Sequence, residues 1–330
     1  MKILVLGGSG HIGRRLLAHM AVTPGLVTVS ASRGRKPATA GVAAIRLDIR
    51  NEVALAVALA DVDCVVNCVA GDAASIADGA TTLVNAARTA GHPGIIHLST
   101  MSVYGRQEGT LDEDARLDPE LGWYAQAKCL AEQEIERYVD LGGYAVILRP
   151  GCVYGPDSQL WVGRIARLLH AGRLGDLGTQ GDGWSNLVHV DDVCHAVLAA
   201  IHLMPNIHDH RETGKPAVFN LAAPDSPRWN EYFRDLALAI GAVPLRRIGI
   251  GRVKADAYIA SPAVKIAEKI AYHIGLDRSR FPDPLPPGLL HLFGQQIRLD
   301  SHRAEAQLDM AWTPYATGLN DSVQSIHAAS

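Results

Sequence analysis

The sequence has no apolar run long enough to span a bilayer, and it has no N-terminal segment of the secretory kind. Its first apolar run, at 2–6, ends at Gly7. These absences predict a cytoplasmic protein with no membrane partner. The net charge of −3 lacks the basic excess that nucleic acids attract, so no nucleic-acid partner is expected. Internal repeats and low-complexity tracts are also missing.

Disulfide and metal frameworks are not indicated either. No paired C-x-x-C spacing occurs, which favours reduced, buried thiols over a disulfide framework. Two histidine groups contain potential metal ligands, one at 202–210 in a polar loop and one at 189–192 that has the pattern of a helix N-terminus with capping carboxylates. Neither predicts a metal site. The cysteines are Cys64, Cys68, Cys129, Cys152 and Cys194.

What the chain does have is a regular alternation of strand-like and helical segments. Its 330 residues are 48% hydrophobic and 20% charged, as expected of an enzyme with a substantial core. The alternation predicts βαβ units and therefore a Rossmann-type, doubly wound parallel sheet of the α/β class. The expected strands lie at 2–6, 26–31, 43–47, 63–70, 94–99 and 144–149, and the expected helices near 51–60, 75–90 and 122–140.

After residue 150 the rhythm becomes irregular, and glycine, proline and tryptophan become more frequent. We expect a smaller C-terminal substrate-binding lobe to begin there. Two later strand-like segments, 186–190 and 217–221, are expected to return to the first sheet and to make the lobe discontinuous. The predicted division is a dinucleotide-binding domain at 1–150 with returns at 185–221, and a lobe at 151–184 and 222–330.

The N-terminal strand KILVL at 2–6 runs directly into GGSGHIG at 7–13. Glycines at 7, 10 and 13 allow a tight turn, a close approach to a pyrophosphate and close packing of the following helix on the sheet. The helix N-terminus then faces the phosphates. A glycine turn can also merely connect two elements, but the strand before it and the helical face after it favour dinucleotide binding.

A second motif is YAQAK at 124–128, which follows STMSVYG at 99–105, the end of a predicted strand. Tyr124 and Lys128 are one helical turn apart, so a lysine cation can favour ionisation of the phenol. The phenol could then exchange a proton with a substrate oxygen. The alternative is a surface helix pair with no chemical role, because this spacing is common by chance.

Together with LRPGCVYGP at 148–156, HVDDV at 189–193 and LDMAWTP at 308–314, these motifs resemble the extended short-chain dehydrogenase/reductases, the NAD(P)-dependent epimerase/dehydratase-like group. The resemblance spans nearly the whole chain. It implies a homodimer through the helix that carries Tyr124 and its neighbour.

The resemblance also implies roles for particular residues. Tyr124 would be the catalytic acid/base, Lys128 its partner and a ribose ligand, and Thr100 the hydroxyl that positions the substrate oxygen, with Ser102 as the competing candidate. An asparagine that the family places in the helix before the catalytic strand is not evident, since Asn85 is too late and Ala77 or Asp78 stands there. The expected cofactor-binding residues are Gly7, Ser9, Gly10, His11, Ile12, Gly13, Ser32, Arg33, Asp48, Ile49, Cys68, Val69, Ala70, Lys128, Pro150 and Val153.

Cofactor preference depends on the end of the second strand. NAD-preferring members of such folds place a carboxylate there, whereas SASRGRK at 30–36 offers hydroxyl and guanidinium groups that suit a 2′-phosphate. NADP(H) is therefore favoured and NAD(H) is the alternative; the loop could also be merely solvated. Asp48 resembles an adenine-contacting aspartate, and the alternative is a turn or helix-cap carboxylate ahead of 52–59. Asn67 is expected near the cofactor without a chemical role.

The reaction that this sequence favours is reduction of a small-molecule carbonyl by NADPH. Thr100 is followed by Met101-Ser102 instead of the Asp-Glu of related dehydratases, and Gly151-Cys152 lacks the asparagine of related nucleotide-sugar epimerases. The alternatives are an epimerase with retained NAD and a non-catalytic NADP-binding sensor.

The substrate itself stays open. Stacking by Trp161 or Trp184, anion binding by Arg106 or Arg173, and an apolar lid at 281–293 each compete with ordinary packing or solvation.

Overall fold

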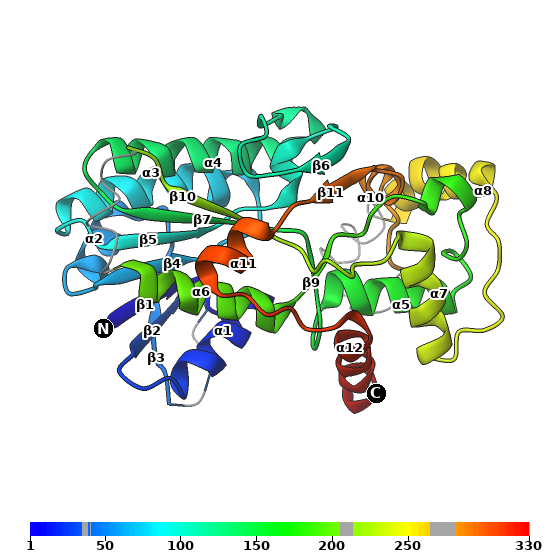
Figure 1. The fold of residues 1–330 in the computed structure, drawn as a ribbon, viewed down its shortest axis with the longest axis horizontal. Coiled ribbons are helices and arrows are strands. Elements are labelled where there is room, and N and C mark those ends of the chain that lie inside the picture. Colours follow the sequence, from blue (N-terminus) through cyan, green and yellow to red (C-terminus); the bar gives the residue numbers. More distant parts are fainter. Residues whose placement is uncertain (35–38, 40, 205–213, 265–281, 330) are drawn as a thin grey trace.

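A computed structural model of the chain describes residues 1–34, 39, 41–204, 214–264 and 282–329. At its centre is a seven-stranded, all-parallel sheet in the order β10-β7-β5-β4-β1-β2-β3 (Figure 1). The predicted α/β class with a doubly wound sheet is therefore confirmed. The strands are β1 (Lys2–Leu6), β2 (Val27–Ser32), β3 (Ala43–Arg46), β4 (Cys64–Asn67), β5 (Gly94–Leu98), β7 (Ala145–Pro150) and β10 (Ala217–Leu221).

The central strands consist of continuous apolar runs because helices cover both faces of the sheet. Strands β4, β5 and β7 are buried at every position. One face packs on α1 (His11–Ala21), α6 (Val190–Leu203) and α11 (His302–Leu308). The other packs on α2 (Glu52–Leu59), α3 (Ala73–Thr89) and α4 (Trp123–Asp140).

The strand order reverses direction between β1 and β4. On one side of β1 the chain adds β2 and β3, and on the other side it adds β4, β5 and β7. In open parallel sheets, ligands bind outside the carboxyl ends of the strands at such a switch point. The glycine turn directly follows β1, and Cys68–Ala70 directly follow β4. The topology of the sheet therefore predicts a ligand-binding site at this edge.

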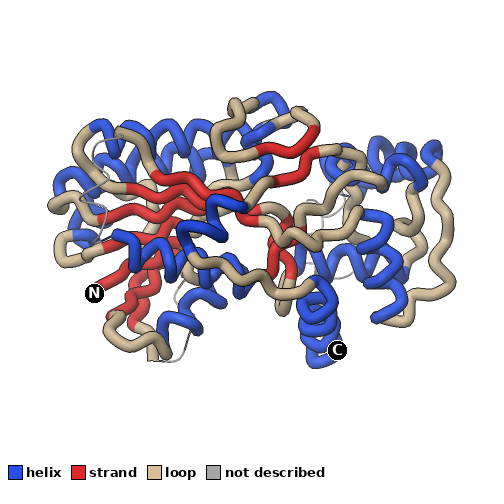
Figure 2. The backbone as a smooth tube through the Cα atoms, in the orientation of Figure 1, coloured by secondary structure: helices blue, strands red, loops and turns tan. Residues whose placement is uncertain are grey.

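The second lobe lies beyond the carboxyl ends of the strands and is mainly helix and loop (Figure 2). Its core is aromatic: Trp229, Tyr232, Phe233 and Phe293 are fully buried, and the Trp229 and Phe293 rings lie 4.9 Å apart. Its helices are α5 (Arg164–His170), α7 (Trp229–Ala239), α8 (Ile250–Ala255), α10 (Pro287–Phe293) and α12 (Tyr315–Ala329), with short helical turns η3 (Gln159–Gly163), η4 (Gly178–Gly181) and η6 (Asp256–Ala260).

Two short ladders lie between the large sheet and the lobe (Figure 2). One joins β8 (Cys152–Tyr154) to β9 (Leu187–His189), and the other joins β6 (Gly109–Leu111) to β11 (Ile297–Leu299). The segment 217–221 forms β10 in the large sheet, as expected. The expectation that 186–190 also returns to that sheet is wrong, because β9 pairs only with β8 before the chain enters α6. The remaining turns are η1 (Met101–Tyr104) and η2 (Pro119–Leu121).

All five cysteines are unpaired, and four of them are buried. None of the helices in the described part of the chain combines the length and the hydropathy needed to traverse a bilayer.

Candidate active site

A cavity of about 770 Å³ opens at the carboxyl ends of the strands and extends to the lobe. Its walls come from the turns after β1, β2, β3, β4, β5 and β7 on one side, and from η3 and α10 on the other. Every residue predicted to bind the cofactor or to act in catalysis lines this cavity, except Lys128. Sequence segments that are far apart in the chain thus meet in one place.

The glycine turn has the shape that a pyrophosphate needs. Gly7 adopts a φ of +78°, and a Cβ there would lie 2.9 Å from the carbonyl of Cys68. A Cβ on Gly13 would collide with the carbonyl oxygen of Gly7, so the start of α1 can approach the turn only because this residue is glycine. The turn is anchored to β2, since the Gly7 amide donates to the Ala31 carbonyl at 3.0 Å.

His11 adds a polar group at the N-terminus of α1. It lines the cavity, and its Nε2 is buried without a hydrogen-bond partner. Burial, together with the charge of Arg14, lowers the pKa of His11 to about 4. A neutral ring with an unsatisfied nitrogen beside the helix N-terminus fits a phosphate oxygen as a partner.

The end of β2 presents Ser32 and the exposed side chain of Arg33 to the cavity. No carboxylate stands at this strand end. Asp48, after β3, lines the same region and pairs with Arg50 at 3.0 Å. Hydrogen bonds from Arg50 lower the pKa of Asp48, and Arg33 contributes to the same effect. Residues 35–38 of the basic loop lie outside the described residues.

Asp48 does not cap the helix, but it does hold the turn before it, since its Oδ1 accepts from the Arg50 amide at 3.0 Å. The cap of α2 is Asn51, whose Oδ1 accepts from the Ala54 amide at 3.0 Å. Asn67 lies behind the cavity wall: its Oδ1 accepts from the Val69 amide at 3.1 Å, and its Nδ2 lies 3.2 Å from His97 Nδ1. It therefore shapes the turn that lines the cavity.

Tyr124 and Thr100 meet at the carboxyl end of β5. Burial raises the pKa of Tyr124, and a hydrogen bond with the Thr100 side chain opposes this rise. Thr100 Oγ1 also lies 3.3 Å from Ser102 Oγ, and both hydroxyls line the cavity. Of the two hydroxyls, only that of Thr100 affects the pKa of the phenol, so it is the better placed candidate.

Lys128 is buried one helical turn below Tyr124. Its Nζ donates to the carbonyl of Leu98 at 2.6 Å and reaches that of Val69 at 3.5 Å. Burial lowers the pKa of Lys128 to about 8. The expected lowering of the phenol pKa by the lysine is not among the effects on Tyr124 in this structure. The ammonium instead joins the chain segments at the carboxyl ends of β4 and β5.

A buried polar network behind the site was not foreseen from the sequence. Glu132, one turn beyond Lys128, forms an ion pair with Arg149 at 2.7 Å and accepts a short hydrogen bond from Ser99. Arg149 also donates to the Tyr104 phenol at 2.9 Å, which donates to Asn220 Oδ1. The network joins β5, β7, β10, η1 and α4. The signal that could have found it is the polarity of these positions within otherwise apolar elements.

The missing family asparagine has no evident replacement in the structure. Asn85 lies on the outer side of α3, where it bonds to Glu52 and Arg137. At the start of α3 it is Ser75 that lines the cavity, and its amide and hydroxyl are both held by Asp72.

The lobe side of the cavity is lined by Trp161 and by leucines of η3 and α10. Of the other candidates for substrate contact, Trp184 stacks with Arg228 and Arg298, and Arg173 pairs with Asp256 at 2.5 Å. Neither lines the cavity, and nor does Arg106. Phe281 of the proposed lid lies outside the described residues, whereas Leu289 and Leu292 of the same segment do line the cavity.

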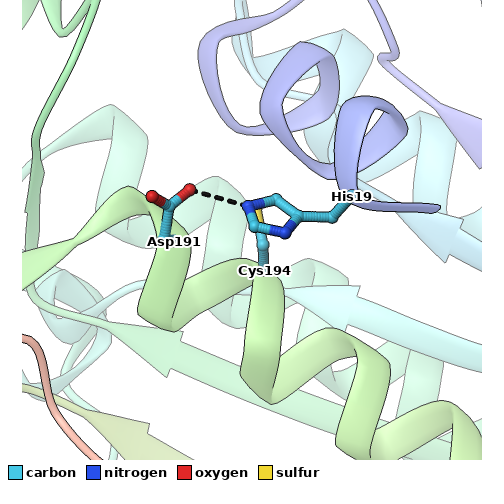
Figure 3. A group of neighbouring side chains, drawn as sticks. All are labelled: His19, Asp191 and Cys194. Carbon is cyan, nitrogen blue, oxygen red and sulfur yellow. Dashed lines mark hydrogen bonds and ion pairs between the residues drawn. The ribbon is translucent and has the colours of Figure 1, made fainter. Parts of the chain in front are cut away.

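One group of potential metal ligands joins α1 to α6. A ring nitrogen of His19, a carboxylate oxygen of Asp191 and the thiol of Cys194 lie within 4.8 Å of one another (Figure 3). However, Arg15 donates to both carboxylate oxygens, at 2.5 and 2.8 Å. Burial alone would raise the pKa of Asp191, but hydrogen bonds from Arg15 and His19 hold it below its usual value. The group forms an interhelical ion pair, and we assign no metal to it.

The predicted histidine groups are explained differently. His189 caps α6 by accepting from the Asp191 amide at 3.3 Å, and Asp192 bonds to Thr313. The prediction of a helix N-terminus is confirmed, but the expected capping by carboxylates is wrong, because the cap is the His189 side chain and Asp191 bonds to Arg15. In the other group, His202 belongs to the last turn of α6, while His208 and His210 lie outside the described residues.

Comparison with known proteins agrees with this geometry. The model of the NAD dependent epimerase/dehydratase family matches residues 3–230. A 2-alkyl-3-oxoalkanoate reductase of Stenotrophomonas maltophilia is 33% identical over 60% of this chain, a match that covers 64% of that protein and so less than two thirds of its length. A 4-hydroxy-2-methyl-3-oxo-4-farnesyl-3,4-dihydroquinoline-1-oxide ketoreductase of Stigmatella aurantiaca is 24% identical over 94% of this chain and 92% of its own length.

Among solved structures, the fold is similar to that of a UDP-glucose 4-epimerase from Thermotoga maritima, solved with UDP-glucose. The TM-score is 0.74 at 19% identity, over 100% of this chain and 99% of the epimerase. At this identity the likeness concerns the fold alone.

Proposed function

The chain belongs to the NAD dependent epimerase/dehydratase family, and on that premise we propose that it is an NADP(H)-dependent reductase of a small-molecule carbonyl, or catalyses the reverse oxidation. The observation that carries this proposal is that Tyr124 and Thr100 line the same cavity, whose other end has a dinucleotide-binding turn, and that the Thr100 side chain lies close enough to affect the pKa of the phenol. The two matched reductases, whose names describe keto substrates, give further support.

The proposed chemistry divides between cofactor and protein. The reduced nicotinamide, when bound, supplies a hydride to the carbonyl carbon. Tyr124 gives its proton to the oxygen as negative charge develops there, and Thr100 donates a hydrogen bond to the same oxygen. Lys128 keeps a cation beneath the site and fixes the turns after β4 and β5. The gain comes from orientation and from stabilisation of the developing charge.

Tyr124→Phe tests the catalytic assignment. The variant should lose at least about 100-fold in kcat because no proton donor remains at the carbonyl oxygen. Its dissociation constant for NADPH should stay within about twofold, since the phenyl ring keeps the packing. Steady-state oxidation of NADPH and fluorescence titration measure the two quantities. Retention of most of the turnover would remove Tyr124 from the mechanism.

The preference for NADP(H) is a second part of the proposal. Ser32 and Arg33 at the end of β2 would bind the 2′-phosphate, where charge-assisted hydrogen bonds are strong. Arg33→Ala should weaken NADPH binding by about 10-fold or more and change NADH binding by less than about twofold. Arg88→Ala, which removes an exposed cation from α3, is the matched control. Equal losses for both cofactors would contradict the assignment.

An epimerase with tightly held NAD is the competing function within the same family. Denaturing the purified protein and identifying any released nucleotide separates the two. Empty protein that binds NADPH reversibly supports the reductase, whereas stoichiometric NAD released only on denaturation supports the epimerase.

We also propose a homodimer through α3 and α4. On α4, Trp123 and Leu130 are seven residues apart, hence on one face, and their exposed fractions are 56% and 46%. Exposed apolar side chains aligned in this way are typical of an interface.

A further inference from the structure

The lobe-side wall of the cavity is apolar. Leu160 and Trp161 come from η3, and Leu289 and Leu292 come from α10, three residues apart and therefore on one face. Leu160 is 43% exposed, and the two α10 leucines are half-buried. The turn η3 is a π-helix, an irregular turn that is often found at functional sites. The wall therefore presents leucine and tryptophan side chains to whatever occupies the cavity.

Trp161 is held firmly in this wall. Its carbonyl oxygen accepts from the Tyr232 phenol at 2.7 Å, and its ring lies 5.4 Å from that of the fully buried Trp229. Both partners belong to the aromatic core of the lobe. The apolar surface is thus formed before any ligand binds, which limits the entropy lost on binding.

The charges of the cavity lie elsewhere. Among the described lining residues, the cations Arg14 and Arg33 belong to the glycine-turn side. The only charged residue among the described lining residues of the lobe side is an anion, Asp157, which lies just before η3. The arginines on and after α5 are committed to carboxylates of the lobe. Arg167 pairs with Asp283, Arg164 approaches it at 3.9 Å, and Arg173 pairs with Asp256 at 2.5 Å.

This distribution is unfavourable for a nucleotide sugar. Its diphosphate carries negative charge that needs cationic or strongly donating partners once removed from water. The described lobe-side lining offers one amide side chain, Gln159, and no cation. An uncharged ligand has no charge that must be removed from water when it binds against this wall.

We propose that the substrate is an uncharged ketone or aldehyde with an apolar group, aliphatic or cyclic, that lies against Leu160, Trp161, Leu289 and Leu292. This inference rests on the proposed reductase function. The carbonyl oxygen lies at Tyr124 and Thr100, and the apolar group extends toward η3 and α10. In the reaction the C=O π bond breaks, a C–H bond forms with the hydride of NADPH, an O–H bond forms with the Tyr124 proton, and NADPH becomes NADP⁺.

Binding of unbranched 2-alkanones from four to eight carbons tests the proposal without turnover. The series is titrated into Tyr124→Phe saturated with NADP⁺, and the dissociation constants are measured by calorimetry. Each added methylene should tighten binding by about two- to fourfold, because it is transferred from water to the apolar wall. UDP-glucose is titrated in parallel and should bind more weakly than 2-octanone.

Two variants in the same background locate the effect. Leu160→Asn carries little folding risk at a 43% exposed position, and Leu289→Asn changes the opposing helix. Each should reduce the gain per methylene to less than about 1.5-fold. Leu238→Asn is the matched control, since Leu238 lies on α7, is 63% exposed and does not line the cavity. Thermal unfolding shows that each variant is folded.

The outcomes separate the two proposals. A dissociation constant independent of chain length, or tighter binding of UDP-glucose than of 2-octanone, overturns the apolar substrate. A chain-length gain that survives Leu160→Asn and Leu289→Asn overturns its location. If the gain is found but the unmodified enzyme oxidises no NADPH with any bound ketone, the reductase function fails and the apolar site stands.

Discussion

Tyr124 and Lys128 lie one turn apart on α4, yet in this structure they contact different groups. The phenol interacts with the Thr100 side chain, and the ammonium donates to the carbonyl of Leu98. The spacing predicted their shared face correctly, because a helix places residues four apart on one side. It could not predict the depth of the lysine, which depends on how closely α4 packs against β5.

That depth leads to a prediction about pH. Burial lowers the pKa of Lys128 from 10.5 to about 8, so its ammonium is present below pH 8 and is lost above it. If the cation is needed, kcat/KM for the reduction should fall by about tenfold between pH 7 and pH 9, since this parameter follows ionisations of the free enzyme. A pH–rate profile measures it.

Lys128→Arg separates this cause from others, because a guanidinium stays charged throughout that range. Whatever activity the variant retains should be flat between pH 7 and pH 9. A fall of the same size in the arginine variant would show that another group is responsible.

At the scale of elements, the Glu132–Arg149 pair ties α4 to β7 where both border the cavity. Their side chains are 0% and 4% exposed. Removing one member leaves the other as an uncompensated buried charge, which typically costs about 3–5 kcal/mol. Glu132→Leu should therefore lower the free energy of unfolding by about that amount. Urea unfolding measures this free energy. The same variant should also lose turnover, because Glu132 accepts the hydrogen bond of Ser99, the residue before Thr100.

The double variant Glu132→Leu/Arg149→Met is the informative comparison. With both charges removed, the loss should be smaller than in Glu132→Leu alone, since apolar replacement of a whole buried pair is often near neutral. Additive losses from the two substitutions would mean that the pair is not coupled.

At the scale of the whole molecule, the proposed homodimer can be tested by its mass in solution, which is twice that of a single chain. Light scattering should give twice the 35.2 kDa of one chain. Leu130→Lys places a charge in the proposed α3–α4 interface and should shift the protein toward the monomer. Leu238→Lys, at another exposed leucine on α7, should leave the mass unchanged. A monomer in the unmodified protein would contradict the proposal.

The sequence by itself determined the local features. Continuous apolar runs and helical periodicity identified the first six strands of the large sheet and α2, α3 and α4 to within three residues at each end. The glycines of the first turn and the helical spacing of Tyr124 and Lys128 were equally readable, because each depends on neighbours within a few positions. The placement of 217–221 in the sheet was also expected from its pattern.

Only the tertiary structure decided which distant segments meet. β9 has the pattern of a strand for the large sheet but pairs with β8, and the chain then enters α6 directly. Leu160 and Leu292 line the same wall of the cavity, and Arg173 forms an ion pair with Asp256. Both arrangements result from packing of the lobe, which no local sequence pattern predicts. Long-range pairings are fixed by the fit of whole elements to one another, and the chemistry that distinguishes this cavity depends on them.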